Sequence, residues 1–181
     1  RINRSTIVLT RMVAFAVITA SSLWAGTIDF VVPAFRGSAN SEFGYWETFT
    51  VPFGAPDNLP DQPGATTGAI LTQFNTIAFL TDSRNIYNLS TSSFALTDST
   101  PFALGAVVLQ TRTIGSELDY GSASLICSND SGGHVLAPLF RYELNRTSGQ
   151  GVNVSSLWQW DLTGLGVTNY NVVFNAVGDS V

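Results

Sequence analysis

Short apolar runs separated by polar turn clusters form the dominant pattern of this chain. The runs are rich in β-branched and aromatic residues, and none shows the 3.6-residue period of an amphipathic helix. They cover residues 27–35, 45–53, 69–74, 77–81, 94–97, 106–113, 122–127, 135–144, 157–162 and 170–177. We expect an all-β fold, an antiparallel two-sheet β-sandwich with jelly-roll or Greek-key connections. An immunoglobulin-type sandwich is the alternative, although it usually has fewer strands and often a cysteine pair.

Two runs carry more specific predictions. In the run 170–177, Val172 and Phe174 share one face and Asn171 and Asn175 share the other, which predicts a strand with one solvated face. The stretch 104–109 is apolar at nearly every position, which predicts a central strand covered on both sides.

Turn-forming residues mark the connections. The segment 54–64 holds three prolines, two glycines and two aspartates, which predicts a long surface loop. The segments 128–133 and 146–151 are also rich in turn residues, and each separates two predicted strands, which favours hairpin connections.

The first 25 residues have the pattern of a secretory signal peptide. Arg1, Arg4 and Arg11 supply positive charge, and an apolar stretch over 12–24 follows. This stretch is shorter than the roughly 20 residues that a membrane-spanning helix needs, so a membrane anchor or buried helix is the weaker alternative. Cleavage after Ser22 or after Ala25 both remain open. We therefore expect a signal peptide over 1–25 and one β-sandwich domain over 26–181, without a membrane span and secreted or at the cell surface.

Composition excludes some classes of partner and changes the expected source of stability. Lysine is absent, and the eight basic residues are scattered arginines in a chain of net charge -5, so we expect no nucleic-acid binding. Only 12% of residues are charged, so Ser, Thr, Asn, Gln and Gly must form the solvated faces. The single cysteine, Cys127, cannot form an internal disulfide, and we expect it to be a small buried hydrophobic residue.

Catalytic motifs are weak in this sequence. The only histidine is His134, and no Gly-x-Ser-x-Gly motif accompanies it, which argues against a Ser-His-Asp hydrolase. Glu117 and Asp119 would point to the same side of an extended strand, about 7 Å apart, as a pair of glycosidase carboxylates could. Such acids also occur on any solvated strand beside a turn, and we favour that interpretation. We therefore expect a protein that is not an enzyme.

Calcium is the metal that best suits the acidic residues of the predicted loops. Asp57 and Asp61 in the proline-rich segment and Asp130 in a glycine-rich turn could supply carboxylate ligands. None of them stands in the Asp-x-Asp-x-Asp-Gly pattern of a dedicated calcium loop. We expect no cofactor and favour a role in turns for these residues, with calcium as the alternative.

Tryptophans are the candidate ligand-binding residues. Trp158 and Trp160 lie on one face of the predicted strand 157–162, and Trp46 stands in another predicted strand. Exposed rings would form a platform on which sugars stack, whereas buried rings would form the core. The area that tryptophan buries favours the core.

One resemblance adds to these observations. The segments 106–120 and 158–162, with the signal-like start, resemble exported bacterial proteins of the PEP-CTERM sorting class. The resemblance implies export and a place at the cell surface or in the extracellular matrix. A Pro-Glu-Pro motif, an apolar helix and an arginine cluster should then follow Val181, so the resemblance implies a chain truncated at its C-terminus. It supplies no catalytic residues.

Three functions follow from these features. The leading prediction is a non-enzymatic secreted or cell-surface β-sandwich module that binds polysaccharide or contributes to an extracellular matrix, with Trp46, Glu117, Asp119, Trp158 and Trp160 at its ligand face. The second is a structural or assembly module without a small ligand, which burial of the tryptophans would favour. The third is a glycan-active hydrolase or lyase that uses Glu117 and Asp119.

Overall fold

The protein is all-β. The computed structural model describes residues 30–61, 65–115, 117–149 and 151–178, and the predicted signal peptide 1–25 lies outside them. Within these ranges there is no helix, and hence none of the length and apolarity needed to cross a membrane. The strands are β1 (Gly54–Asn58), β2 (Ile70–Gln73), β3 (Phe79–Leu80), β4 (Ile86–Tyr87), β5 (Ser92–Ser99), β6 (Ala106–Gly115), β7 (Leu118–Asn129), β8 (Gly132–Leu136), β9 (Phe140–Gly149), β10 (Gly151–Asp161) and β11 (Asn169–Ala176).

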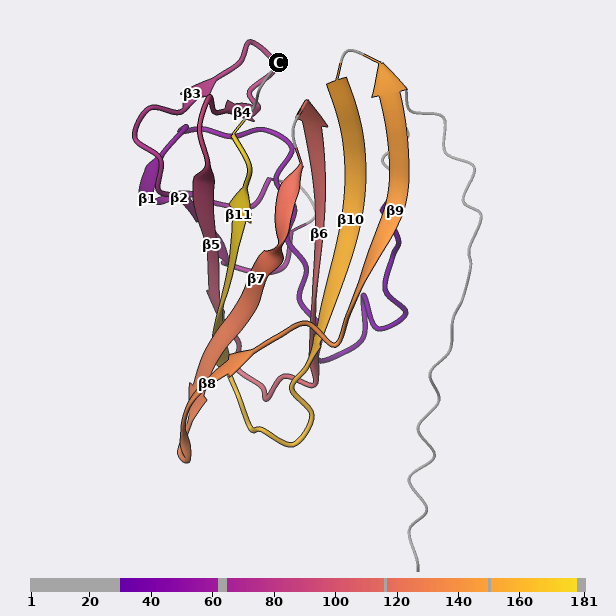
Figure 1. Cartoon of the computed structure of the whole chain (residues 1–181). Coiled ribbons are helices and arrows are strands. Elements are labelled where there is room, and N and C mark those ends of the chain that lie inside the picture. Colours follow the sequence, from indigo (N-terminus) through magenta and orange to yellow (C-terminus); the bar gives the residue numbers. More distant parts are fainter. Residues whose placement is uncertain (1–29, 62–64, 116, 150, 179–181) are drawn as a thin grey trace, which may run out of the picture.

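All strand pairs are antiparallel, and they form two larger sheets and a small one (Figure 1). The six-stranded sheet has the order β1-β2-β5-β11-β7-β8, and the three-stranded sheet has the order β6-β10-β9. β3 and β4 form a separate hairpin. β8 belongs to the six-stranded sheet and β9 to the three-stranded sheet, so the chain changes sheets at residues 137–139.

Side chains from both larger sheets meet in one hydrophobic cluster. Trp158 and Trp160 of β10 are 1% and 0% exposed, and Leu125 of β7 and Val172 of β11 are 0% exposed. Burial of apolar area is worth about 25 cal/mol per Å², so two fully buried indoles make a large contribution to the stability of this arrangement. Cys127 belongs to the same cluster, as predicted, and burial raises the pKa of its thiol.

Most of the predicted strands are confirmed. The runs 69–74, 77–81, 94–97, 106–113, 122–127, 157–162 and 170–177 each overlap one strand. The run 135–144 contains parts of two strands, β8 and β9, because the chain changes sheets in the middle of it. The hairpins are confirmed as well, with Asn129 paired to Gly132 and Gly149 paired to Gly151.

Two predicted strands are wrong. The run 45–53 and the described part of the run 27–35 form loops and turns instead. Trp46 and Phe49 pack against the hydrophobic cluster from such a loop, so their apolar character reflects burial without strand pairing. Conversely, the predicted loop 54–64 begins with a strand, β1, which pairs with β2.

Of the two more specific predictions, the one for 170–177 is confirmed for its buried face and the one for 104–109 is wrong. β11 lies between β5 and β7, and its Val172 and Phe174 are buried, which confirms the predicted inward face. The apolar stretch 104–109 does not form a central strand, because β6 lies at the edge of its sheet. Beyond this edge, the Gln110 side chain accepts a hydrogen bond from the Val31 N–H and donates one to the Val31 carbonyl, each 2.8 Å long.

The two core tryptophans differ in the hydrogen bonding of their indole N–H groups, which allows a matched comparison. The Nε1–H of Trp160 donates to the Leu136 carbonyl (3.1 Å), whereas Nε1 of Trp158 has no hydrogen-bond partner among the described residues. We expect Trp160→Phe to lower the free energy of unfolding by about 1 kcal/mol more than Trp158→Phe, because only the first leaves a carbonyl unpaired. Urea denaturation of both variants measures the difference. Equal losses would show that the Trp160 hydrogen bond contributes nothing.

Candidate functional site

The inner face of β9 is charged, although it belongs to the sheet that carries the core tryptophans. Residues opposite each other in an antiparallel pair share a face. Arg141, Glu143 and Arg146 lie opposite Trp158, Ser156 and Val154 of β10, respectively. A register shift at Ser155/Ser156 leaves Leu144 without a partner. This bulge keeps Glu143 and Arg146 on one face although they are three residues apart.

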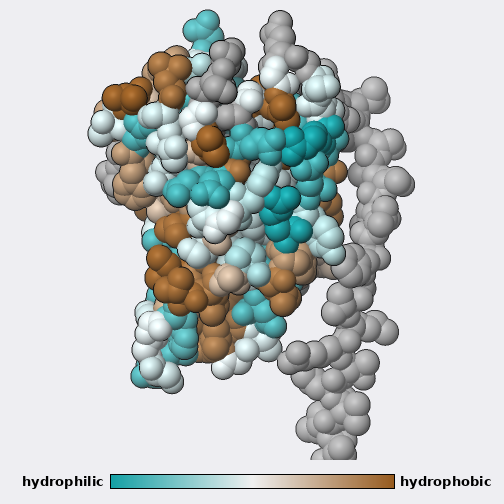
Figure 2. All heavy atoms as spheres, viewed as in Figure 1, coloured by the Kyte–Doolittle hydropathy of each residue, from teal (hydrophilic) through white to brown (hydrophobic). Residues whose placement is uncertain are grey.

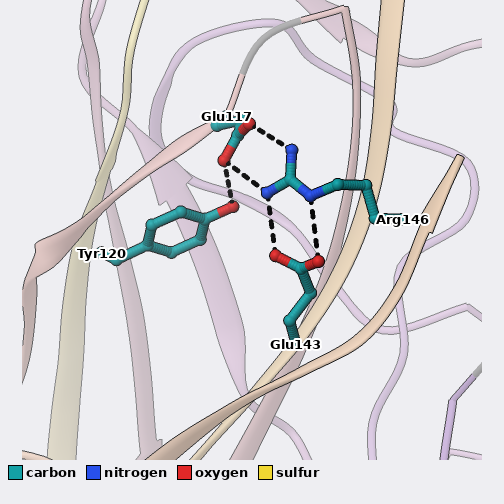
Figure 3. Close-up of polar contacts among 4 residues, drawn as sticks. All are labelled: Glu117, Tyr120, Glu143 and Arg146. Atoms are coloured by element: carbon teal, nitrogen blue, oxygen red, sulfur yellow. Dashed lines mark hydrogen bonds and ion pairs between the residues drawn. The ribbon is translucent and has the colours of Figure 1, made fainter. Parts of the chain in front are cut away.

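Arg146 of β9 binds two carboxylates, that of Glu143 on its own strand and that of Glu117 from the other larger sheet (Figure 3). Its Nη1 and Nη2 donate to the two oxygens of Glu117, at 2.6 and 3.0 Å. Its Nε and Nη2 donate to the two oxygens of Glu143, at 2.9 and 2.8 Å. Glu117 directly precedes β7, so this fork-like pairing connects the start of β7 with β9.

Tyr120 completes the group, which we call the Arg146 cluster (Glu117, Tyr120, Glu143 and Arg146). Its hydroxyl donates to Glu117 Oε2 at 2.6 Å. Its ring lies between polar and apolar neighbours, with the Arg141 Cζ 3.8 Å from the ring centroid and the Trp158 ring 6.2 Å away. The tyrosine therefore links the ion pairs to the hydrophobic cluster.

The electrostatics of the Arg146 cluster keep both carboxylates ionised. Hydrogen bonds from Arg146 and then from Tyr120 lower the pKa of Glu117 to about 2. Hydrogen bonds from Arg146 likewise lower the pKa of Glu143. The hydrogen bonds to Glu117 and Glu143 in turn raise the pKa of Arg146. Burial, followed by the hydrogen bond to Glu117, raises the pKa of Tyr120. A carboxyl group with a pKa near 2 holds no proton at neutral pH, so Glu117 is unsuited to general-acid catalysis.

Asp119 has different partners from Glu117. Its Oδ1 accepts the Gly121 N–H (3.1 Å), and its carbonyl accepts the Ser122 hydroxyl (2.6 Å). The Ser122 hydroxyl oxygen in turn accepts the Asn175 N–H of β11 at 2.8 Å. These contacts stabilise an irregularity of β7, where the register with β11 shifts between Asp119 and Ser124. The structure thus gives Asp119 a role in a bulge, whereas Glu117 is bound by Arg146 and Tyr120.

The three candidate tryptophans do not form an exposed platform. Trp158 and Trp160 are buried, and Trp46 is half-buried against the same hydrophobic cluster. A sugar cannot stack on a ring that other side chains already cover. The structure therefore favours the interpretation that Trp158 and Trp160 form the core over the hypothesis that they form a ligand face.

The candidate metal ligands lie in two separate segments of the chain, Asp57 and Asp61 in one and Asp130 in the other. Asp61 Oδ2 accepts the N–H groups of Glu47 (2.6 Å) and Thr48 (3.0 Å), so this carboxylate holds a loop. Asp130 is exposed at the turn between β7 and β8, and the side chain of Asp57 lies outside the described part of the structure. Among the described residues, no three His, Cys, Asp or Glu side chains gather as a metal site would require.

An open hollow lies beside Asp130, between the β7–β8 turn and the loop before β11. Its lining is polar and contains no aromatic residue: Ser128, Asn129, Asp130, Ser131, Gly164, Leu165, Gly166, Thr168 and Asn169. Asn129 fixes the turn to the loop, because its Nδ2 donates to the Leu165 carbonyl (2.7 Å). The His134 Nε2 lies 3.2 Å from Asn129 Oδ1 in the same network. His134 therefore has a local structural partner.

The Arg146 cluster gives a prediction on pH. Because the folded-state pKa of Glu117 lies below the unfolded value of about 4.3, its contribution to stability is present above that value and is lost as pH falls toward about 2. We expect Arg146→Met to raise the titration midpoint of the Glu117 carboxyl toward its ordinary value, as followed by carbon NMR. The shift should shrink at high salt, because about a third of the Glu117 side chain is exposed.

A matched control for this titration is Arg112→Met. Arg112 lies on the opposite face of the same sheet, where its Nε donates to Asn153 Oδ1 (3.1 Å). Its loss should leave the Glu117 midpoint unchanged. An unaltered midpoint in Arg146→Met would show that the ion pair does not persist in solution.

Comparison of the chain with protein-family models, with curated proteins and with solved structures found no match. Function must therefore be inferred from the residues themselves. Glu117 is paired with arginine, Asp61 and Asp119 accept backbone N–H groups, and the tryptophans of β10 are buried.

Proposed function

We propose that this chain is a non-enzymatic, exported structural or assembly module of a cell surface or extracellular matrix. In this proposal the two larger sheets are the layers of a β-sandwich, with connections of the jelly-roll or Greek-key type. The burial of Trp158 and Trp160 carries the proposal, because it removes the aromatic platform that a glycan-binding face would need. The signal-like pattern of residues 1–25 and the polar, lysine-free composition support export.

The occupied carboxylates argue against the hydrolase or lyase alternative. Glu117 is bound by Arg146 and Tyr120, and Asp119 accepts a backbone N–H of its own bulge. Retaining and inverting glycosidases need one carboxyl group that is protonated at the working pH and a second that faces it. The lowered pKa of Glu117 makes it a poor candidate for the protonated group, which supports a non-enzymatic role.

Tryptophan fluorescence of the domain 26–181 tests the structural proposal. Core indoles should give blue-shifted emission that acrylamide quenches weakly. We expect no change on titration with a panel of soluble polysaccharides, with or without calcium, because no glycan or metal can reach Trp158 or Trp160. Protection or a spectral shift caused by one glycan would contradict the proposal.

A second candidate function, polysaccharide binding, is favoured by one observation on the outer face of β9. Phe140 and Tyr142 have ring centroids 5.1 Å apart, and Tyr142 is 53% exposed. Gln159 of β10 lies opposite Phe140 and can present its amide on the same face. An exposed tyrosine packed on a half-buried phenylalanine, beside an amide, is a suitable surface for the face and hydroxyl groups of a sugar ring.

The two candidate functions are separated by a substitution. If this face binds a polysaccharide, Tyr142→Ala should lower affinity about tenfold in affinity electrophoresis, because stacking on the ring is lost. Phe79→Ala is the control, since Phe79 is also an exposed aromatic residue (49%) but lies in the small β3–β4 sheet. Equal affinities of the wild type and both variants would leave the structural module as the only proposal.

A further inference from the structure

The open hollow between the turn 128–131 and the loop 164–169 lies at the end of the molecule opposite the β3–β4 hairpin (Figure 1). Its volume of about 540 Å³ is within the range of sites that hold small ligands. None of its lining residues belongs to the Arg146 cluster or to the outer face of β9. The hollow is therefore a separate surface from those already described.

Hydrogen bonds fix both walls of the hollow. In the turn, Asn129 Oδ1 accepts the Ser131 N–H (2.9 Å), while Asn129 Nδ2 donates to the Leu165 carbonyl of the loop (2.7 Å). The loop is held from its other side, where the Val167 carbonyl accepts the Leu104 N–H (2.8 Å) and the Val167 side chain is buried in the hydrophobic cluster. Walls that are already ordered lower the entropic cost of binding a ligand.

The polar side chains of the lining have no protein partners. Within the described ranges, no hydrogen bond or ion pair involves the side chains of Ser128, Asp130, Ser131, Thr168 and Asn169. They present hydroxyl groups, a carboxylate and an amide, which together can donate and accept hydrogen bonds. Because these groups line one hollow, a single ligand can replace the water on several of them at once.

The composition of the lining restricts the chemistry of the ligand. Asp130 is its only ionisable residue, and neither arginine nor an aromatic ring lines the hollow. A phosphate, sulfate or uronic acid would meet the Asp130 carboxylate without a compensating cation, which disfavours anions. A neutral polyhydroxylated molecule fits better, because its hydroxyl groups can donate to the carboxylate and can also accept from the Asn169 amide.

We propose that the hollow binds a neutral saccharide unit, with Asp130 accepting hydrogen bonds from the sugar hydroxyl groups and Thr168 and Asn169 binding from the opposite wall. Without stacking on an aromatic ring, the affinity should be low, with a Kd of about 1 to 10 mM. This inference goes beyond the proposed function, because it gives the structural module a ligand. No tryptophan lines the hollow, so the fluorescence test above is a separate one.

Amide NMR spectra of the full chain, titrated with glucose, galactose and mannose, test the proposal. We expect saturable shifts with at least one of these sugars, centred on the amides of Asp130, Ser131 and Thr168. Glucuronic acid should bind at least about fivefold more weakly than the neutral sugar, because its carboxylate is repelled by Asp130. The proposal is overturned if none of the three sugars gives saturable shifts, or if the shifts centre on Tyr142. It is also overturned if calcium alone produces the same shifts.

Substitutions on the two walls identify the groups that bind. Asp130→Asn should weaken binding of the sugar about tenfold, because a neutral acceptor of the same shape replaces a charged one. Thr168→Val removes the hydroxyl group from the loop and should weaken binding about threefold. Both residues are exposed, so the amide spectrum of the sheets should be unchanged in both variants.

Asp82→Asn is the matched control. It makes the same change at an exposed aspartate in the turn between β3 and β4, at the other end of the molecule (Figure 1). Its affinity for the sugar should equal that of the wild type. Equal affinities of Asp130→Asn and Asp82→Asn would contradict the role of Asp130 and overturn the proposed site.

Discussion

The burial of two indole rings from one strand, β10, is the interaction on which the rest of this structure depends. Trp158 and Trp160 point from the central strand of the three-stranded sheet into the cluster shared with the six-stranded sheet. A chain without an internal disulfide must obtain its stability from such contacts. The same burial removes these rings from solvent, so what stabilises the fold also decides which functions its surface can have.

The Arg146 cluster lies at the border of that core, where Tyr120 contacts Trp158. β9 lies at the edge of its sheet, and the core tryptophans lie on its neighbour β10. Here the inner face carries Arg141, Glu143 and Arg146, and Glu117 approaches from the other sheet. Figure 2 shows the hydrophilic surface of this region above a more hydrophobic lower part. Charge and hydrogen bonding thus replace apolar packing where the side chains of β9 are partly exposed to solvent.

The sequence predicts the strands that obey simple alternation and misses whatever depends on irregular register. The pattern of β11 is legible because Val172 and Phe174 keep strict period two. Glu143 and Arg146 are three residues apart, which places them on opposite faces of a regular strand, and only the bulge at Leu144 unites them. The apolar residue Trp46 falls in a predicted strand that is a loop in the structure, because hydrophobicity reports burial and not strand pairing.

The scarcity of charge explains why one arginine serves two carboxylates at β9. With eight basic residues and no lysine, few cations are at hand, and Arg146 is shared between two glutamates in one place. Hydrogen bonds and an ion pair with arginine favour the ionised form of a carboxylate, so protonation of Glu117 opposes its pairing with Arg146. Acidification therefore weakens the link between β7 and β9 only as the pH falls below about 4.3, the ordinary glutamate pKa, toward the pKa of about 2 that Glu117 has in the fold.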